Sequence, residues 1–285
     1  MNLQAFYQTV SVPLALSAAS MALFFSILFF GVLSLTYFLV VFLLTYAVYG
    51  MDRLAGLEED RLSHPERTSF LQRNRWSFAV SIVLAFSVSL LLAAASGWVA
   101  VLIPLAPIVV IIYSGNLSLK VLGTRGLHLK QYFIIKNISI ASGWAFLLPL
   151  TLFYLNRPMG TGQWLFLIPL LMKLFVMAVA YDFKDINSDR RAGVRTLPVV
   201  LGEDLSKLVL HILNTVATGL ILLLVYFGLL PILGIILVPA FIYQFFMIQL
   251  VRKDAPEWVY FGLCDLEQFF WLVFLGMGGW AISLF

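Results

Sequence analysis

Long apolar stretches fill most of this chain, and its charged residues gather in a few short segments between them. Of the 285 residues, 62% are hydrophobic and only 11% are charged. A soluble domain carries about 25% charged residues, so the composition excludes an ordinary water-soluble protein. Apolar stretches of about 20 residues match the hydrocarbon thickness of a bilayer. The sequence therefore predicts an all-α polytopic membrane protein.

The apolar pattern predicts nine transmembrane helices, which we expect to form a single domain over residues 1–285. Short links such as Ser96-Gly97 indicate that neighbouring spans form antiparallel hairpins. The single cysteine, Cys264, excludes a disulfide within the chain. The expected spans are 13–31, 34–51, 76–97, 99–115, 132–154, 162–182, 206–227, 229–250 and 262–284.

Basic residues are divided unevenly between the two sides that these spans would create. Sixteen of the 18 follow spans two, four, six and eight, whereas Arg157 lies on the other side and Lys173 lies within span six. By the positive-inside rule, the N-terminus is expected to be cytoplasmic and the C-terminus to lie on the opposite side. The net charge of +4 belongs to this inner face and does not indicate nucleic-acid binding.

Two acidic clusters lie about 120 residues apart, each at the cytoplasmic end of an apolar span. Carboxylates at a membrane face are unfavourable unless something compensates their charge. Mg²⁺ holding a diphosphate would do so, because Mg²⁺ binds carboxylates together with phosphate oxygens and water. We therefore expect two acidic-motif halves around one central cavity that opens to the cytoplasm. The first cluster contains Asp52, Glu59 and Asp60, and the second contains Asp182, Asp185 and Asp189.

The second cluster reads D-x-x-D-x-x-x-D-x-x-x-G-x-x-T-L-P from Asp182 to Pro198. If the helix of span six continued through it, the three aspartates would fall within roughly 60° of one another on one face. The first cluster ends in Asp60-Arg61, followed by Pro65 and Arg67. With these motifs the chain resembles the UbiA-type intramembrane prenyltransferases, and the resemblance extends over essentially its whole length. Further matching residues are Tyr113-Ser114, Lys120, Lys136-Asn137 and Trp144.

The resemblance implies a nine-helix protein that uses Mg²⁺ to transfer a prenyl group from a polyprenyl diphosphate to an acceptor. It implies catalytic and metal-binding roles for Asp52, Asp60, Asp182, Asp185 and Asp189, with Glu59 as a further metal ligand. Candidate diphosphate-binding residues are Arg53, Arg67, Lys120 and Lys130, although the positive-inside topology alone would also place basic residues there.

The first motif departs from the family pattern at two positions. The family's middle aspartate falls on Gly56, and its asparagine falls on Asp52. The number of carboxylates is therefore kept, but one carboxylate moves by about one helical turn. Glu59 is a candidate to replace the missing ligand.

Three further charged residues lie in or near the apolar spans. Lys173 lies on the helix face opposite Asp182, so it either has a function or pairs within the bundle. Asp265 and Glu267 are interpreted as interfacial residues, with a place in the cavity wall as the alternative.

The function implied by the resemblance is Mg²⁺-dependent transfer of a prenyl group at the cytoplasmic membrane face. The acceptor is a small molecule, either an aromatic compound or a polar lipid precursor. Two alternatives stay open: an intramembrane terpene cyclase, and a non-catalytic prenyl-diphosphate binding protein in which Gly56 reflects lost activity.

Overall fold

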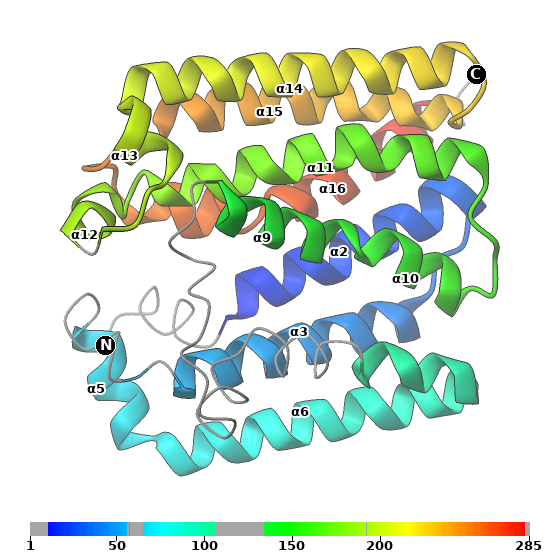
Figure 1. The fold of residues 1–285 in the computed structure, drawn as a ribbon. Helices are drawn as coiled ribbons and strands as arrows, with labels where there is room; N and C mark the ends of the chain where they lie inside the picture. The colour runs from blue at the N-terminus through cyan, green and yellow to red at the C-terminus, as the bar shows by residue number, and fades with distance from the viewer. Residues whose placement is uncertain (1–10, 56, 58–64, 106–133, 192, 283–285) are drawn as a thin grey trace. The chain divides into compact units, whose positions relative to one another are not determined.

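A computed structural model describes residues 11–55, 57, 65–105, 134–191 and 193–282 (Figure 1). Every regular element in these ranges is a helix. Seven helical segments within them are long and apolar enough to cross a membrane. The chain is thus an all-helical, multi-pass membrane protein. The seven segments are Val12–Phe30, Leu35–Ala55, Arg75–Ser96, Ile135–Tyr154, Thr161–Asp182, Glu203–Tyr226 and Ile232–Leu250.

The expected number of nine spans stays a prediction. Most of the expected fourth span lies within 106–133, outside the described residues. The expected ninth span is represented by α16 (Glu267–Ile282), whose 16 residues are preceded by the π-helix η4 (Val259–Cys264).

Residue contacts divide the chain into two compact units, and α2 (Val12–Phe30) contributes to both. The first comprises residues 1–22 and 34–127. Within it, α3 packs along α6, and Gly50 permits the close approach because a Cβ there would lie 2.8 Å from Ile82 Cγ1. Ser89 Oγ donates a hydrogen bond to the Val40 carbonyl at 2.9 Å across the same contact. The described helices of this unit are α3 (Leu35–Ala55), α5 (Pro65–Arg73), α6 (Arg75–Ser96) and the 3₁₀ helix η1 (Trp98–Val101).

The second unit comprises residues 23–33 and 128–285, and it contains the second acidic motif. Helix α11 lies between α9 and α14, α14 packs on α15, and α15 packs on α16 (Figure 1). Its described helices are α9 (Ile135–Ala145), α10 (Leu147–Tyr154), α11 (Thr161–Asp182), α12 (Ile186–Arg191), α13 (Leu197–Leu201), α14 (Glu203–Tyr226), η3 (Ile232–Ile236), α15 (Leu237–Leu250), η4 and α16.

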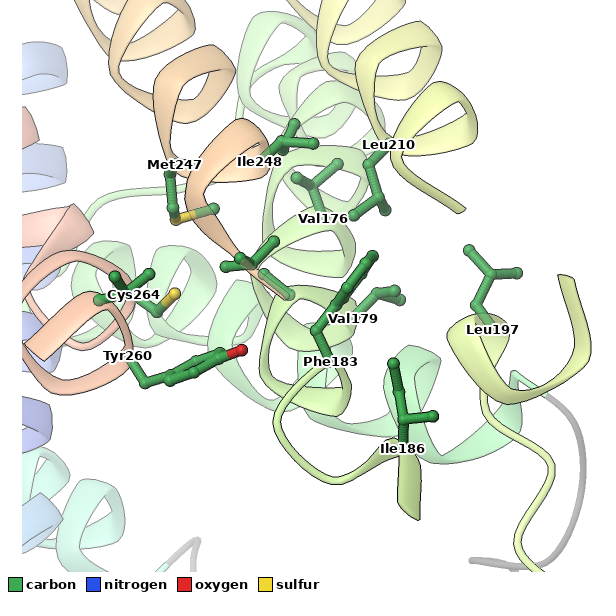
Figure 2. Close-up of a cluster of buried hydrophobic side chains, with 13 residues drawn as sticks. Val176, Val179, Phe183, Ile186, Leu197, Leu210, Met247, Ile248, Tyr260 and Cys264 are labelled. Atoms are coloured by element: carbon green, nitrogen blue, oxygen red, sulfur yellow. The ribbon is translucent and has the colours of Figure 1, made fainter. Parts of the chain in front are cut away.

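The two ends of α11 are held in different ways. At its start, a Cβ on Gly162 would collide with the carbonyl oxygen of Leu229, so the helix lies directly against the turn after α14. At its other end, Val176, Val179 and Phe183 belong to a buried apolar cluster shared with α14, α15 and η4 (Figure 2). This packing fixes the segment of α11 that leads into the acidic motif.

Candidate active site

The apolar residues of the second motif fix its position in the fold. Phe183, Ile186 and Leu197 are at most 4% exposed and pack in the cluster of Figure 2. The carboxylates alternate with these apolar residues along the chain. Burying the apolar side chains therefore holds the acidic groups at the end of α11, because each apolar side chain is anchored in a densely packed core.

The helix does not continue through this motif, contrary to the single-helix arrangement considered from the sequence. Helix α11 ends at Asp182, and the Asp185 amide donates to the Asp182 carbonyl at 3.1 Å in a tight turn. Helix α12 then begins at Ile186, and the Asp189 amide donates to the Asp185 carbonyl at 2.7 Å. The three carboxyl groups still lie close enough to repel one another electrostatically.

The G-x-x-T-L-P sequence forms the connection from α12 to α13. Gly193 adopts a φ of 71°, the left-handed conformation that favours glycine after a helix. Its amide donates to the Arg190 carbonyl and the Val194 amide donates to the Asp189 carbonyl, the two bonds of a Schellman motif. Thr196 is the N-cap residue of α13, and Pro198 occupies its first turn, where the missing amide is tolerated. The G-x-x-T-L-P sequence thus supplies the residues that end α12 and begin α13.

Asp182 is the most tightly held carboxylate of the motif. Lys136 Nζ donates to its Oδ1 at 2.8 Å, and Asn137 Nδ2 donates to its Oδ2 at 2.8 Å. Asp182 is 1% exposed, and Asn137 is equally buried. Both donors come from the start of α9, which packs against α11. Charge-assisted hydrogen bonds of this kind are the strong ones, so they fix the orientation of the carboxylate.

Asp189 is held differently. Its Oδ2 is buried and makes no hydrogen bond of good geometry among the described residues, although the Thr196 hydroxyl lies beside this carboxyl group. Burial raises the pKa of this carboxyl, the charge of Lys136 lowers it, and the neighbouring Asp182 and Asp185 raise it further. A buried acceptor without a well-formed hydrogen bond requires an explanation, such as a bound ion or water.

The donor set of this motif fits Mg²⁺, which prefers carboxylate oxygens. This oxygen of Asp189 supplies a specific site of attachment. Within the described ranges, however, no three His, Cys, Asp or Glu side chains are close enough to complete a metal site. The second motif therefore supplies part of a coordination shell and needs further oxygen ligands.

Only part of the first motif lies in the described structure. Asp52 is exposed at the end of α3, and Arg53 is half-buried beside it. Glu59, Asp60, Lys120 and Lys130 lie outside the described residues, as does the side chain of Arg67. The expectation that both motifs face one central cavity stays a prediction.

Lys173 and Glu267 are both buried in the second unit. Lys173 pairs within the bundle, since its Nζ donates to Asn214 Oδ1 at 2.9 Å and to Gln244 Oε1 at 3.4 Å. The interfacial interpretation of Glu267 was wrong, because this side chain is 0% exposed within the protein. It lies beside Gln244 of α15, against which α16 packs.

Sequence reasoning did not assign a site role to Lys136 or Asn137. Both were noted only as part of a matching loop, yet they hold Asp182 directly. The available signal was the position of a basic-amide pair at the start of an apolar span. Such a pair is unfavourable in the membrane unless it has a polar partner.

Comparison with known proteins settles the family. A family model described as the UbiA prenyltransferase family matches residues 10–273. The chain belongs to this family. UbiA membership accounts for the multi-pass helical fold and the acidic motif at the end of α11. No curated protein matches the chain.

Solved structures similar to this UbiA chain share its fold at low sequence identity. A UbiA homologue from Archaeoglobus fulgidus bound to DMAPP and Mg²⁺ has a TM-score of 0.65 and 15% identity, covering 95% of this chain and 98% of its own. An apo UbiA homologue from Aeropyrum pernix K1 has a TM-score of 0.60 and 17% identity, covering 96% and 98%. A structure described for digeranylgeranylglyceryl phosphate synthase has a TM-score of 0.56 and 17% identity, also covering 96% and 98%.

Proposed function

We propose that this protein transfers a prenyl group from a polyprenyl diphosphate to a small-molecule acceptor, using Mg²⁺, at the cytoplasmic membrane face. The observation that carries the proposal is the acidic motif at the end of α11. There Asp182 is oriented by two charge-assisted hydrogen bonds, and Asp189 keeps a buried oxygen without a well-formed hydrogen bond. The family membership and the prenyl ligand of the Archaeoglobus fulgidus homologue support the same chemistry.

In this proposal, the two acidic motifs hold Mg²⁺ together. The second motif contributes Asp182, Asp185 and Asp189, and the first contributes Asp52 and Asp60, with Glu59 as a further ligand. Arg53, Arg67, Lys120 and Lys130 bind the diphosphate, because cationic side chains form strong hydrogen bonds to phosphate oxygens. The concentration of basic residues on the same side supports a cytoplasmic site, with the N-terminus inside and the C-terminus outside.

The reaction would proceed by ionisation of the allylic diphosphate. Bound Mg²⁺ supplies positive charge that stabilises the leaving diphosphate. The protein's own part is to orient the Asp182 carboxylate through Lys136 and Asn137, and to surround the prenyl cation with apolar helices that exclude water. The carbon–oxygen bond to diphosphate breaks, and the acceptor nucleophile forms the new bond to the allylic carbon with loss of its proton.

A non-catalytic prenyl-diphosphate binding protein is the second candidate, and Gly56 is the observation that favours it. This glycine stands where the family pattern has an aspartate, although Asp52 restores the number of carboxylates. An enzyme releases diphosphate from its substrate, whereas a binding protein does not. A terpene cyclase would also release diphosphate, but without an added acceptor.

The test is diphosphate release from geranyl diphosphate by the purified protein, with and without Mg²⁺ and a panel of acceptors. We expect Mg²⁺-dependent release that an acceptor accelerates. The Asp185→Ala variant should lose activity by about a thousandfold or more, because losing a metal ligand removes several kcal/mol of transition-state stabilisation. A normal size-exclusion profile serves as the control for its folding.

The outcomes separate the candidates. Near-normal release by Asp185→Ala would overturn the metal assignment. Release that never depends on an acceptor would favour the cyclase. A silent wild type together with an active Gly56→Asp variant would favour the binding protein, since the restored aspartate would have repaired a defective site.

A further inference from the structure

A layer of polar side chains crosses the apolar interior of the second unit. Four helices contribute to it, and each of the four principal side chains is at most 1% exposed. Gln244 Nε2 donates to the Lys173 carbonyl at 2.9 Å, and Asn214 Nδ2 donates to the Phe241 carbonyl at 3.1 Å. Buried polar groups inside a membrane protein are unfavourable without a purpose. The layer consists of Lys173 on α11, Asn214 on α14, Gln244 on α15 and Glu267 on α16.

Glu267 is the exceptional member of this layer. Neither of its carboxylate oxygens makes a hydrogen bond of good geometry among the described residues, although it lies beside Gln244 and Trp271. The Trp271 indole N–H, which lies beside this carboxylate, likewise makes no hydrogen bond of good geometry among the described residues. The opposite charge that acts on Glu267 is Lys173, and Glu267 is in turn the charge that acts on Lys173.

Among the described residues, the ammonium group of Lys173 hydrogen-bonds only to amide oxygens, so Glu267 supplies its compensating charge without touching it. Attraction between two charges is strong at low dielectric, and it persists beyond direct contact.

Lys173 and Asp182 lie on opposite faces of α11. Nine residues separate them, which corresponds to a half-turn difference in direction and a rise of roughly 13 Å. The contacts agree with this geometry, because Lys173 reaches α14 and α15 whereas Asp182 reaches α9. Helix α11 is therefore held by polar contacts on two opposite faces.

A helical irregularity precedes each member of the pair along the chain. Pro169 lies inside α11 one turn before Lys173, where it removes a backbone hydrogen bond and weakens the coupling to the first half of the helix. The π-helix η4 ends three residues before Glu267, with the Asp265 amide bonded to the Tyr260 carbonyl. A π turn changes the direction of the side chains that follow, and such turns are frequent at functional sites.

From these contacts we propose that Lys173 and Glu267 form a buried charge pair that positions Asp182 by fixing the rotation of α11. Both are positioning residues rather than catalytic residues, because neither reaches the acidic motif. The role in metal binding rests on the proposed function, whereas the charge pair itself does not.

The charge pair is tested by a double-mutant cycle on thermal stability in detergent, without substrate. Lys173→Met and Glu267→Gln each leave one buried charge uncompensated, so each should lower Tm by roughly 10 °C. The double variant removes both charges, and its Tm should recover most of that loss. A double variant whose Tm falls by the sum of the two single effects would overturn the pair.

The positioning role is tested by the Mg²⁺ concentration that gives half-maximal thermal protection by geranyl diphosphate. Each single variant should need about 10–100-fold more Mg²⁺, as is usual when the support of a metal ligand is lost, and the double variant, which also lacks the pair, should need as much even where its Tm recovers. Leu275→Ala is the control, because it creates a cavity in α16, where Leu275 is 3% exposed, without touching the pair.

The outcomes of this second test are distinct. If Leu275→Ala shifts the Mg²⁺ requirement as far as the charge variants do, the pair serves stability alone and the positioning role is overturned. If geranyl diphosphate gives the wild type no Mg²⁺-dependent protection, the proposed function fails and the positioning role fails with it. In that case the double-mutant cycle still decides whether the charge pair exists.

Discussion

Lys136 and Lys173 both place an ammonium group against α11, but the protein compensates the two charges differently. Lys136 donates directly to the Asp182 carboxylate at 2.8 Å, and its side chain is 27% exposed. Lys173 is 1% exposed and donates to two amide oxygens, while its opposite charge on Glu267 stays out of hydrogen-bond contact. The Lys136 charge is neutralised by one carboxylate, whereas the Lys173 charge is stabilised by the amide oxygens of two other helices.

This difference suits the two positions. The direct ion pair at the end of α11 neutralises the Asp182 carboxylate, while the Lys136 side chain stays 27% exposed. A lysine surrounded by amides has no such ionic contact, because its ligands are neutral and come from separate helices. We infer that the first arrangement serves ligand binding and the second serves helix packing.

The largest effect should follow from removing the direct ion pair. Lys136→Met leaves Asp182 buried without its counter-charge and should lower the free energy of unfolding by about 3–5 kcal/mol. Thermal unfolding in detergent measures the loss. Lys184→Met is the matched control, because Lys184 is exposed and lies 5.3 Å from the Tyr181 ring, a contact worth about 0.5–1 kcal/mol. Equal losses in the two variants would mean that Asp182 does not depend on Lys136.

Removing one amide from Lys173 should have a smaller effect. Asn214→Leu deletes an acceptor of the ammonium group and the donor to the Phe241 carbonyl, and we expect a loss of about 2 kcal/mol. Thr218→Val is the control, since its hydroxyl donates only to the Asn214 carbonyl and a neutral hydrogen bond contributes about 1 kcal/mol. A loss for Asn214→Leu as large as that for Lys136→Met would show that a single amide, rather than a shared set, compensates Lys173.

The smallest effect concerns the pH dependence of stability at Asp189. The pKa of this carboxyl is raised in the folded state, so the unfolded chain loses the proton at lower pH. Stability therefore falls as the pH rises from the ordinary value of 3.8 through the folded-state pKa. Asp189→Asn should be slightly more stable than the wild type at neutral pH without metal, and the gain should fade in acid.

Thermal unfolding of Asp189→Asn across that pH range checks the sign. Asn187→Ala, at an exposed position of α12, should leave the pH dependence unchanged. A gain for Asp189→Asn that persists below pH 3.8 would have to arise from something other than the charge.

The sequence predicted the membrane class and the seven described segments that could cross a membrane, because long apolar stretches are the strongest signal a chain contains. It also identified the second acidic motif, whose glycine, threonine and proline proved to be capping residues. It did not predict the break after Asp182, because the turn depends on burying Phe183 and Ile186 in tertiary contacts. It misplaced Glu267 for a related reason. A carboxylate near the start of an apolar helix indicates a residue at the membrane interface, and the sequence does not show that Lys173, far away along the chain, acts on it.

The π-helix before α16 has a consequence for insertions and deletions. A π turn accommodates one more residue than the α turn it replaces. Deleting one residue between Val259 and Cys264 would convert it to an α turn and rotate the residues before the deletion by about 100° relative to α16. Tyr260, whose hydroxyl donates to the Arg252 carbonyl at 2.7 Å, would then lose this contact. The length of this segment is thus as firmly specified as the identity of the residues on either side of it.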